Sequence, residues 1–316
     1  MIAFVIAGII AAQPLMATGN ELGVWFVRDT EPGTLGPKHE LCYLFDQEKY
    51  QVVLPLSKRP TALAIHDQTL WFVGDSQHPV LYRARLIENQ ETGEMRTVPN
   101  GKAIAVTSLP IVGEIREIVF LNNEPIVVVE HEGMQCFGID GVAITPKLVG
   151  EGWHIAVLSE ALVAAKSDEA NTIVCIFEDG AWEETGSYNI EGKVHDFIVH
   201  DSWPILVTTK NNAIQIIGLQ QNESVSIASF PNLTGRWTVV VGGGLHAIGA
   251  ERNGTITAFD VGWPSGTTSE RIVLVEQHGS IKAVEMVLLI ATTCMFFIMM
   301  LSILKSKPKK SNKLDS

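Results

Sequence analysis

Apolar residues in most of this chain are gathered in short runs, which are separated by polar turns rich in Gly, Asn and Asp. Short runs rich in Val, Ile, Phe and Trp, bounded by turn residues, are typical of β-strands. Runs such as IVVV, ILVTT and WTVVV are continuous rather than alternating, which indicates strands packed on both faces. Because no amphipathic helical period occurs between the two ends of the chain, we expect the region 22–277 to be all-β.

The strand runs recur as a repeated unit of about 42 residues. In each unit two runs meet at a tight turn, and a third run follows after a second turn. Equivalent positions are separated by 55, 37, 42 and 42 residues, and they fall at Ala62, Glu117, His154, Asp196 and Thr238. The copies lie at 62–86, 117–140, 154–179, 197–219 and 238–260, with a partial first copy at 23–46. A weaker apolar run that would serve as a fourth strand occurs at 103–109, 143–149, 224–230 and 271–277.

Four short strands in each unit of this length are typical of the blades of a β-propeller. We therefore predict a six-bladed β-propeller over residues 22–277. The first unit shows only three strand runs, so its innermost strand must come from residues near the N-terminus or from the other end of the chain. Five or seven blades and a pair of β-sandwiches are the alternative folds.

Residues 60–86, PTALAIHDQTLWFVGDSQHPVLYRARL, carry the clearest copy of the repeat. This segment resembles one blade of the NHL and YVTN-type β-propeller repeats. The resemblance implies the propeller fold. It implies no single activity, since such propellers bind proteins, sugars, peptides or RNA and a minority are enzymes.

The two ends of the chain carry membrane signals. Residues 1–17 begin with an apolar stretch followed by small residues near Ala12 and Ala17, as in a cleaved signal peptide, although no basic residue precedes the stretch. Residues 286–304 contain no charge, and we predict a single transmembrane helix over 283–304. The tail 305–316 holds five lysines, which favours a cytoplasmic tail and places the propeller outside the cytoplasm.

The charge of the remaining chain narrows the range of partners. Residues 1–281 contain 17 Lys and Arg against 33 Asp and Glu, a net charge of −16. This balance argues against binding nucleic acid or anionic lipid headgroups. Cys42, Cys136 and Cys175 outside the predicted helix show neither a CxxC pair nor His at ligand spacing, so at most one disulfide and no cysteine-based metal site is expected.

Few residues suggest chemistry. No nucleophile elbow, HExxH, phosphate loop or calcium loop occurs, so we predict no catalytic residue, no metal and no cofactor. His66-Asp67 and His200-Asp201 pair an imidazole with a carboxylate, but they recur at one turn of the repeat and are interpreted as turn residues. The candidate binding surface is aromatic and consists of Trp153, Trp203, Trp237 and Trp263. The candidate glycosylation sites are Asn222, Asn232 and Asn253.

These observations predict a non-enzymatic, membrane-tethered propeller that binds a protein or other ligand outside the cytoplasm. Only Gln277–Lys282 separate the last strand from the predicted helix, about 20 Å when extended, so a partner in or near the same membrane is expected. One alternative is a metal-dependent, lactonase-like hydrolase that would hold calcium on a ring of carboxylates. These carboxylates would be Asp75, Asp140, Asp179 and Asp260. Another alternative is a structural subunit of a membrane complex, in which Glu285 would contact a partner helix.

Overall fold

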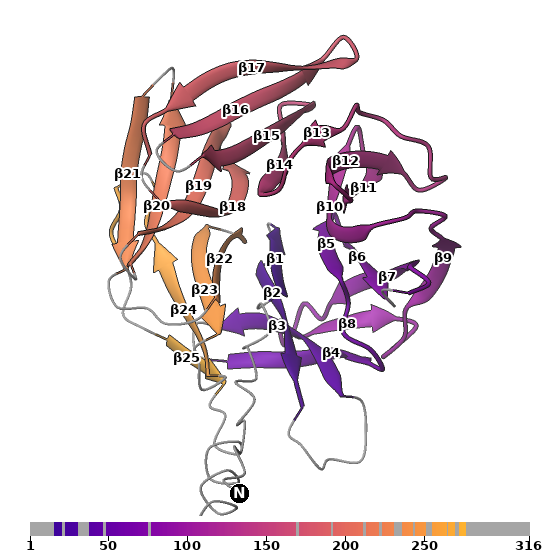
Figure 1. The fold of residues 1–316 in the computed structure, drawn as a ribbon. Helices are drawn as coiled ribbons and strands as arrows, with labels where there is room; N and C mark the ends of the chain where they lie inside the picture. Colours follow the sequence, from indigo (N-terminus) through magenta and orange to yellow (C-terminus); the bar gives the residue numbers. More distant parts are fainter. Residues whose placement is uncertain are drawn as a thin grey trace, which may run out of the picture. The chain divides into compact units, whose positions relative to one another are not determined.

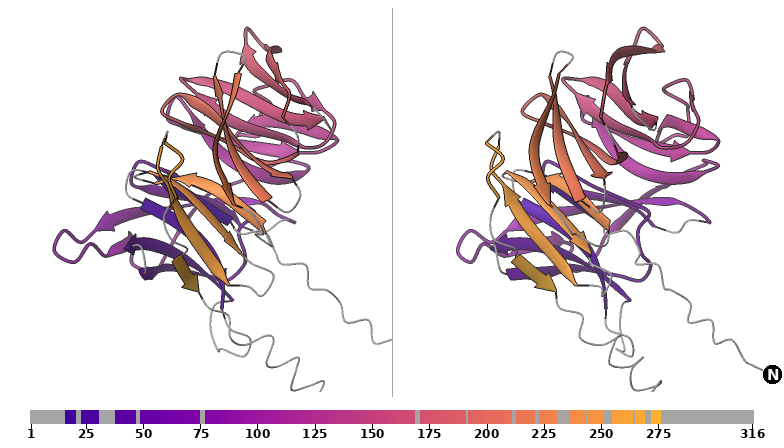
Figure 2. Two further views of the ribbon diagram at one scale, coloured as in Figure 1. Left: turned by 90° about the vertical axis from the view of Figure 1, so that its left-hand side faces the viewer. Right: turned by 60° about the vertical axis from the view of Figure 1, so that its left-hand side comes forward.

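The computed structural model describes residues 16–20, 23–30, 38–46, 49–74, 77–168, 171–190, 192–210, 213–220, 223–230, 236–242, 244–250, 255–263, 265–268 and 272–275. Over these residues the chain forms six antiparallel sheets arranged around a central axis (Figure 1). Successive sheets are tilted one against the next, as Figure 2 shows from two further directions. The prediction of an all-β, six-bladed propeller is therefore confirmed.

Each blade is one contiguous stretch of chain whose strands pair in sequence order. Blades 1 to 3 contain β1 (Met16–Asn20), β2 (Gly23–Asp29), β3 (His39–Asp46) and β4 (Lys49–Leu56); β5 (Ala62–His66), β6 (Thr69–Gly74), β7 (Val80–Glu88), β8 (Met95–Val98) and β9 (Ile104–Ser108); and β10 (Glu114–Leu121), β11 (Glu124–Glu130), β12 (Gly133–Gly138) and β13 (Leu148–Val149). Blades 4 to 6 contain β14 (Trp153–Leu158), β15 (Ala161–Asp168), β16 (Asn171–Glu178) and β17 (Ala181–Tyr188); β18 (Lys193–His200), β19 (Trp203–Lys210), β20 (Ala213–Gln220) and β21 (Glu223–Phe230); and β22 (Arg236–Val241), β23 (Leu245–Ala250), β24 (Ile256–Val261) and β25 (Ile272–Val275).

The outer strand of blade 2 differs from the prediction. The run at 103–109 does form a strand, β9, but it pairs with only one half of β7, where Val80 lies opposite Ser108. The other half of β7 pairs with β8, where Arg85 lies opposite Val98. Two short strands therefore share the fourth-strand position, and the chain between them leaves the sheet edge. The strands β4, β8 and β17 were not predicted, because their sequences are polar or interrupted by Pro.

The missing innermost strand of blade 1 is β1. It pairs with β2, with Met16 opposite Val27 and Asn20 opposite Gly23, and it lies beside β5 of blade 2 and β22 of blade 6. β1 thus fills the gap in the inner ring between the first and last parts of the repeat. Met16 and Ala17 also belong to the predicted signal peptide 1–17, whose other residues lie outside the described ones.

Continuous apolar strands arise because each blade packs on both faces. In β2, Trp25 and Val27 belong to a buried cluster with blade 2, whereas Val24 and Phe26 belong to a buried cluster with blade 6. Similar buried clusters fill each of the other interfaces between neighbouring blades. Alternate side chains along one strand therefore point to two different neighbours, and a polar position on either face would interrupt a core.

Tight turns join the two inner strands of several blades. At Asn122-Asn123 φ is 53° and 64°, at Ser159-Glu160 it is 46° and 69°, and at Asp201-Ser202 it is 49° and 63°. Positive φ at both central residues defines the hairpin turn whose twist matches that of the strands, and Asn and Asp tolerate it best. This confirms the interpretation of Asp201 as a turn residue.

The two faces of the propeller are distinct. We call the face that carries the turns between the first and second strands of each blade the turn face. The connections between third and fourth strands lie on the same face, since neighbouring strands are antiparallel. At the opposite face β1 begins at Met16, and β25 ends with Val275 opposite Ile256. We call this second face the chain-end face.

The C-terminal predictions fall outside the described residues. The chain divides into two units, Met1–Glu276 and Gln277–Ser316, and the strands belong to the first. The predicted helix 283–304 and tail 305–316 lie in the second unit and stay predictions. Within the part of the chain that the structure describes, no helix is long and apolar enough to cross a membrane.

Candidate functional site

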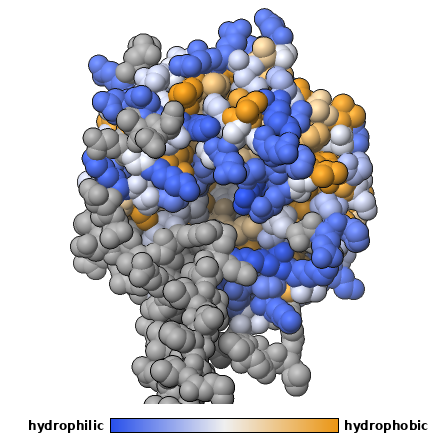
Figure 3. Space-filling model, viewed as in Figure 1, coloured by the Kyte–Doolittle hydropathy of each residue, from blue (hydrophilic) through white to orange (hydrophobic). Residues whose placement is uncertain are grey.

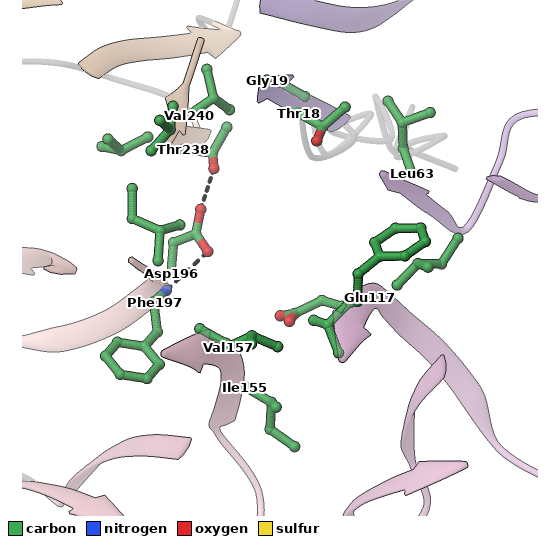
Figure 4. A pocket seen from close by; sticks show the side chains of 18 residues that line it. Thr18, Gly19, Leu63, Glu117, Ile155, Val157, Asp196, Phe197, Thr238 and Val240 are labelled. Atoms are coloured by element: carbon green, nitrogen blue, oxygen red, sulfur yellow. Dashed lines mark hydrogen bonds between the residues drawn. The ribbon is translucent and has the colours of Figure 1, made fainter. Parts of the chain in front are cut away.

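The six innermost strands surround a central channel with a cavity of about 320 Å³. Each of these strands has a neighbour in its sheet on one side only, so its other edge presents backbone N–H and C=O groups to the channel. Most side chains around the cavity are apolar. Figure 4 shows that two carboxylates, Glu117 and Asp196, point into it from opposite sides, with Thr18 and Thr238 also at its wall.

The polar residues of the channel occupy equivalent positions in the blades. In blades 1 to 5 the position is the fifth residue from the inner turn, and it lies opposite a buried residue of the second strand. In blade 6, whose turn is longer, the equivalent residue lies opposite Ile248. Around the ring these residues are Met16, Ala62, Glu117, His154, Asp196 and Thr238. Four consecutive blades thus carry polar groups at one level, while blades 1 and 2 carry apolar ones.

Contacts between neighbouring blades link this polar ring. Glu117 Oε1 lies 3.8 Å from His154 Nδ1, and the backbone N–H of Ile155 donates to the same carboxylate. The imidazole of His154 donates to the carbonyl of Val194 in blade 5. The carboxylate of Asp196 accepts from the hydroxyl of Thr238 in blade 6 and from the backbone N–H of Phe197, the latter at 2.9 Å.

β-Bulges place the two carboxylates. The pairing of β10 with β11 shifts between Ile115 and Glu117, and the pairing of β18 with β19 shifts between Val194 and Asp196. An extra residue at a bulge bends the strand and changes the direction of the side chains that follow. The bulge is repeated in blades 3 and 5 at the same place, directly before the carboxylate.

The cluster holds protons more tightly than the free side chains would. Burial raises the pKa of Glu117, and the nearby charge of Asp196 adds to this, against the opposing effect of His154. Burial alone would lower the pKa of His154, but its close contact with Glu117 and the charges of Glu117 and Asp196 raise it above the ordinary value. Both shifts have the same direction, so the pair keeps a proton at a pH where a free imidazole would lose it.

The geometry gives no support to a calcium-binding ring. Within the described residues there is no group of three or more His, Cys, Asp and Glu that could hold a metal ion. Asp140 and Asp179 follow the third strands of blades 3 and 4, and Asp260 lies within the third strand of blade 6, where its carboxylate is 2.7 Å from His246 Nδ1, so all three are away from the channel. Asp75 lies outside the described residues. The channel cluster itself is suited to binding protons and holding blades together, since each member already has a partner in the next blade.

Two of the predicted tryptophans belong to the packing between strands. Trp237 is buried at 7% exposure, packs on Phe259 at 5.7 Å between ring centroids, and lies directly over Gly249. Trp153 is half-buried near the chain-end face. Its indole N–H donates to Val149 at 3.1 Å, and the Lys166 ammonium lies 5.6 Å from the ring centroid.

The other two tryptophans meet at the turn face. The rings of Trp203 and Trp263 are in edge contact at 5.3 Å, and His200 contacts Trp263 at 5.4 Å. Beside them lies a pocket of about 640 Å³ between blades 5 and 6. We call it the aromatic pocket. It is lined by Val199, His200, Asp201, Val241, Gly244, Leu245, Val261, Gly262 and Trp263.

The aromatic pocket adjoins the channel, because Val241 lines both cavities. Four aliphatic side chains, Val199, Val241, Leu245 and Val261, line it together with Trp263, and Asp201 supplies a carboxylate that is 67% exposed at the rim. This arrangement can take an apolar or aromatic group from outside and leave a neighbouring polar group in contact with Asp201.

The remaining candidates have structural surroundings or lie beyond the described part. His66 Nε2 lies 3.0 Å from Asn123 Oδ1, and its ring stacks on Phe120 at 4.3 Å, so this histidine joins blades 2 and 3. Cys42, Cys136 and Cys175 are free and buried. Asn222, Asn232 and Asn253 are outside the described residues, so their glycosylation stays a prediction.

The sequence already contained the signal for the channel cluster. The repeat intervals align Glu117, His154, Asp196 and Thr238 in one column. A polar column among apolar strand positions marks side chains that need partners of their own, and here the partners are each other. The candidate site predicted from the sequence was the set of four tryptophans, and this polar column was not part of it.

No family model matches this chain, and no curated protein matches it. Solved structures do match. A chain of the nidogen/laminin complex is 12% identical, with 82% of this chain and 92% of that chain covered and a TM-score of 0.52. The Aleuria aurantia lectin in complex with Fucα1-6GlcNAc is 8% identical, with 84% and 97% covered and a TM-score of 0.51. A candidate 6-phosphogluconolactonase of Bacteroides uniformis is 13% identical, with 83% and 97% covered and a TM-score of 0.47.

At these identities the likeness shows the fold alone. The chain has the fold of β-propellers, which is generically a scaffold for binding. The similarity therefore does not show that this chain forms a complex with laminin or binds a sugar.

Proposed function

We propose that this chain is a membrane-tethered propeller that binds a partner protein outside the cytoplasm through its turn face. The observation that carries the proposal is the aromatic pocket, where Trp203, Trp263 and His200 gather beside an apolar cavity. Buried aromatic anchors of this kind supply most of the energy at protein interfaces. The channel cluster, by contrast, is saturated with contacts between blades.

The short tether supports a partner close to the membrane. Seven residues, 276–282, separate Val275 from the predicted transmembrane helix. They span about 25 Å at most. The propeller is therefore expected to stay close to the bilayer, with a partner in or near the same membrane within its reach.

The tether is tested by extracting membranes that contain the full chain with alkaline carbonate. We expect the chain to stay in the membrane fraction, whereas a chain ending at Lys282 should be released. Release of the full chain by carbonate would contradict the tether.

The binding site is tested by purifying the full chain in a mild detergent and comparing the proteins bound to it with those bound to two variants. Trp263→Ala removes an anchor from the aromatic pocket, and Trp153→Ala removes a tryptophan of similar burial near the other face. We expect loss of the partner with Trp263→Ala and retention with Trp153→Ala. Equal binding to all three proteins would refute the pocket as the binding site.

A further inference from the structure

The turn face carries mostly negative charge. Eleven exposed acidic side chains lie in its turns and at the strand ends that adjoin them: Asp67, Glu88, Glu91, Glu94, Glu124, Asp140, Glu160, Glu178, Asp179, Asp201 and Glu223. No Lys or Arg among the described side chains lies in these turns, and two exposed arginines adjoin them in blade 2: Arg85, opposite Thr69 at the start of β6, and Arg96, the second residue of β8. Lys147 follows the long connection after β12, but it lies beside Gly133, at the chain-end face. The side chains of Lys49 and Arg271 are outside the described part.

The chain-end face has no such excess. Its exposed basic side chains are Lys38, Lys58, Arg116, Lys147 and Lys193, and its exposed acidic ones are Asp29, Glu114, Glu132 and Glu151. Some of these form pairs, as where Arg116 lies 2.9 Å from Glu114. The net negative charge of the protein is thus not spread evenly, and acidity for solubility alone would not require this difference between faces.

The aromatic pocket opens into this acidic face. Asp201 is 67% exposed at its rim, and hydrophilic residues dominate the side of the molecule in view in Figure 3, where apolar residues appear as separate spots. Acidic turns around an apolar pocket attract a positively charged partner at a distance and exclude acidic ones. An apolar side chain that enters the pocket then provides affinity that charge alone does not.

We propose that the partner presents a Lys- or Arg-rich protein segment with an apolar or aromatic side chain, and that this side chain enters the aromatic pocket while the basic residues face the acidic turns. This rests on the proposed function, since it names the chemistry of the segment bound at the same pocket. Arginine suits the site best, because its guanidinium both pairs with carboxylates and stacks on indole rings.

The test uses three fluorescently labelled nonapeptides with a central Trp, flanked by Lys and Arg, by Gln, or by Glu. Their binding to the full chain in detergent is measured by anisotropy, at low salt and at about 0.3 M salt. We expect the basic peptide to bind at least about tenfold more tightly than the other two at low salt, and to lose this advantage as salt screens the charges.

Two matched triple variants locate the effect. Asp201→Asn, Glu160→Gln and Glu124→Gln neutralise three turn-face carboxylates, and Glu114→Gln, Glu132→Gln and Glu151→Gln neutralise three at the chain-end face. We expect the first set to weaken the basic peptide by about tenfold, and the second by less than about twofold. Each substitution keeps the size and backbone preference of the side chain, so folding should not differ.

The outcomes separate the two proposals. If the Gln or Glu peptide binds as tightly as the basic one, and Trp263→Ala abolishes this binding, the pocket binds but the partner is not basic. If the basic peptide binds Trp263→Ala as tightly as the unchanged protein, the aromatic pocket is not the binding site. Equal weakening by both triple variants would overturn the assignment to the turn face. Both proposals are supported if the basic peptide loses binding to Trp263→Ala and to the turn-face triple variant, while its binding to the chain-end triple variant is kept.

Discussion

The polar ring of the channel should make the stability of the propeller depend on pH, chiefly through His154. Its pKa is raised because Glu117 and Asp196 outweigh the effect of burial. A group whose folded pKa exceeds its unfolded value stabilises the fold fully below the unfolded pKa, about 6.5 for His. This contribution is lost as pH rises through the folded pKa. Glu117 acts in the same direction, since its pKa is also raised.

The size of the effect follows from the geometry. Two unit charges at the 3.8 Å that separates His154 from Glu117 attract by about 4 kcal/mol at an effective dielectric constant of about 20. Removing both charges from water offsets much of this. Replacing His154 also leaves the Glu117 carboxylate with one partner fewer. We therefore expect His154→Gln to lower the free energy of unfolding by about 2 kcal/mol near pH 6, and by less above pH 8.

Urea unfolding of the full chain in detergent, followed by tryptophan fluorescence between pH 5.5 and 8.5, measures this difference. His78→Gln is the control, because His78 is exposed in the connection between β6 and β7, outside the channel. A difference between wild type and His154→Gln that stays constant with pH, or that grows as pH rises, would refute the argument.

Three further predictions concern packing, thiols and processing. Gly249→Ala should destabilise the propeller by about 2 kcal/mol in urea unfolding, because a Cβ there would overlap the Trp237 ring, whereas Gly244→Ala, with its nearest neighbour 3.7 Å away, should change stability little. Burial raises the pKa of Cys42 and Cys136 to about 12, so peptide mapping after iodoacetamide should find both alkylated only in the unfolded protein; native labelling would contradict their burial. N-terminal sequencing of the mature chain should find a start at or before Met16, because cleavage after Ala17 would remove two residues that pair with Phe26 and Val27; a start at Thr18 would be the opposite result.

The sequence was sufficient to predict the fold because a propeller repeats one local pattern. The alignment that placed Glu117, His154 and Asp196 in register also placed their strands, hairpins and turns in register. Each blade is a contiguous piece of chain, so no long-range pairing had to be guessed. The strands that were missed are those with little apolar content, such as β17, where Trp182 is followed by Glu183 and Glu184.

The candidate site was harder to predict because exposure depends on the neighbouring blade. Trp237 and Trp263 look alike in the sequence, yet one is in the core and the other lines a pocket. Trp237 stands in a first strand, which has a blade on each side, whereas Trp263 stands in a connection after a third strand. The strand position, rather than the residue type, decides which side chains reach the surface, and this becomes visible only once the blades are counted.

The most direct test of the account is to ask which face the partner touches in intact membranes. A photoreactive amino acid is introduced at Ser265, whose hydroxyl lies 3.3 Å from the Gly262 carbonyl at the aromatic pocket, or at the exposed Glu151 near the chain-end face. Illumination of membranes with the full chain should give a crosslinked partner from position 265 and none from 151, and Trp263→Ala should abolish it. A partner crosslinked from position 151 and not from 265 would contradict binding at the turn face.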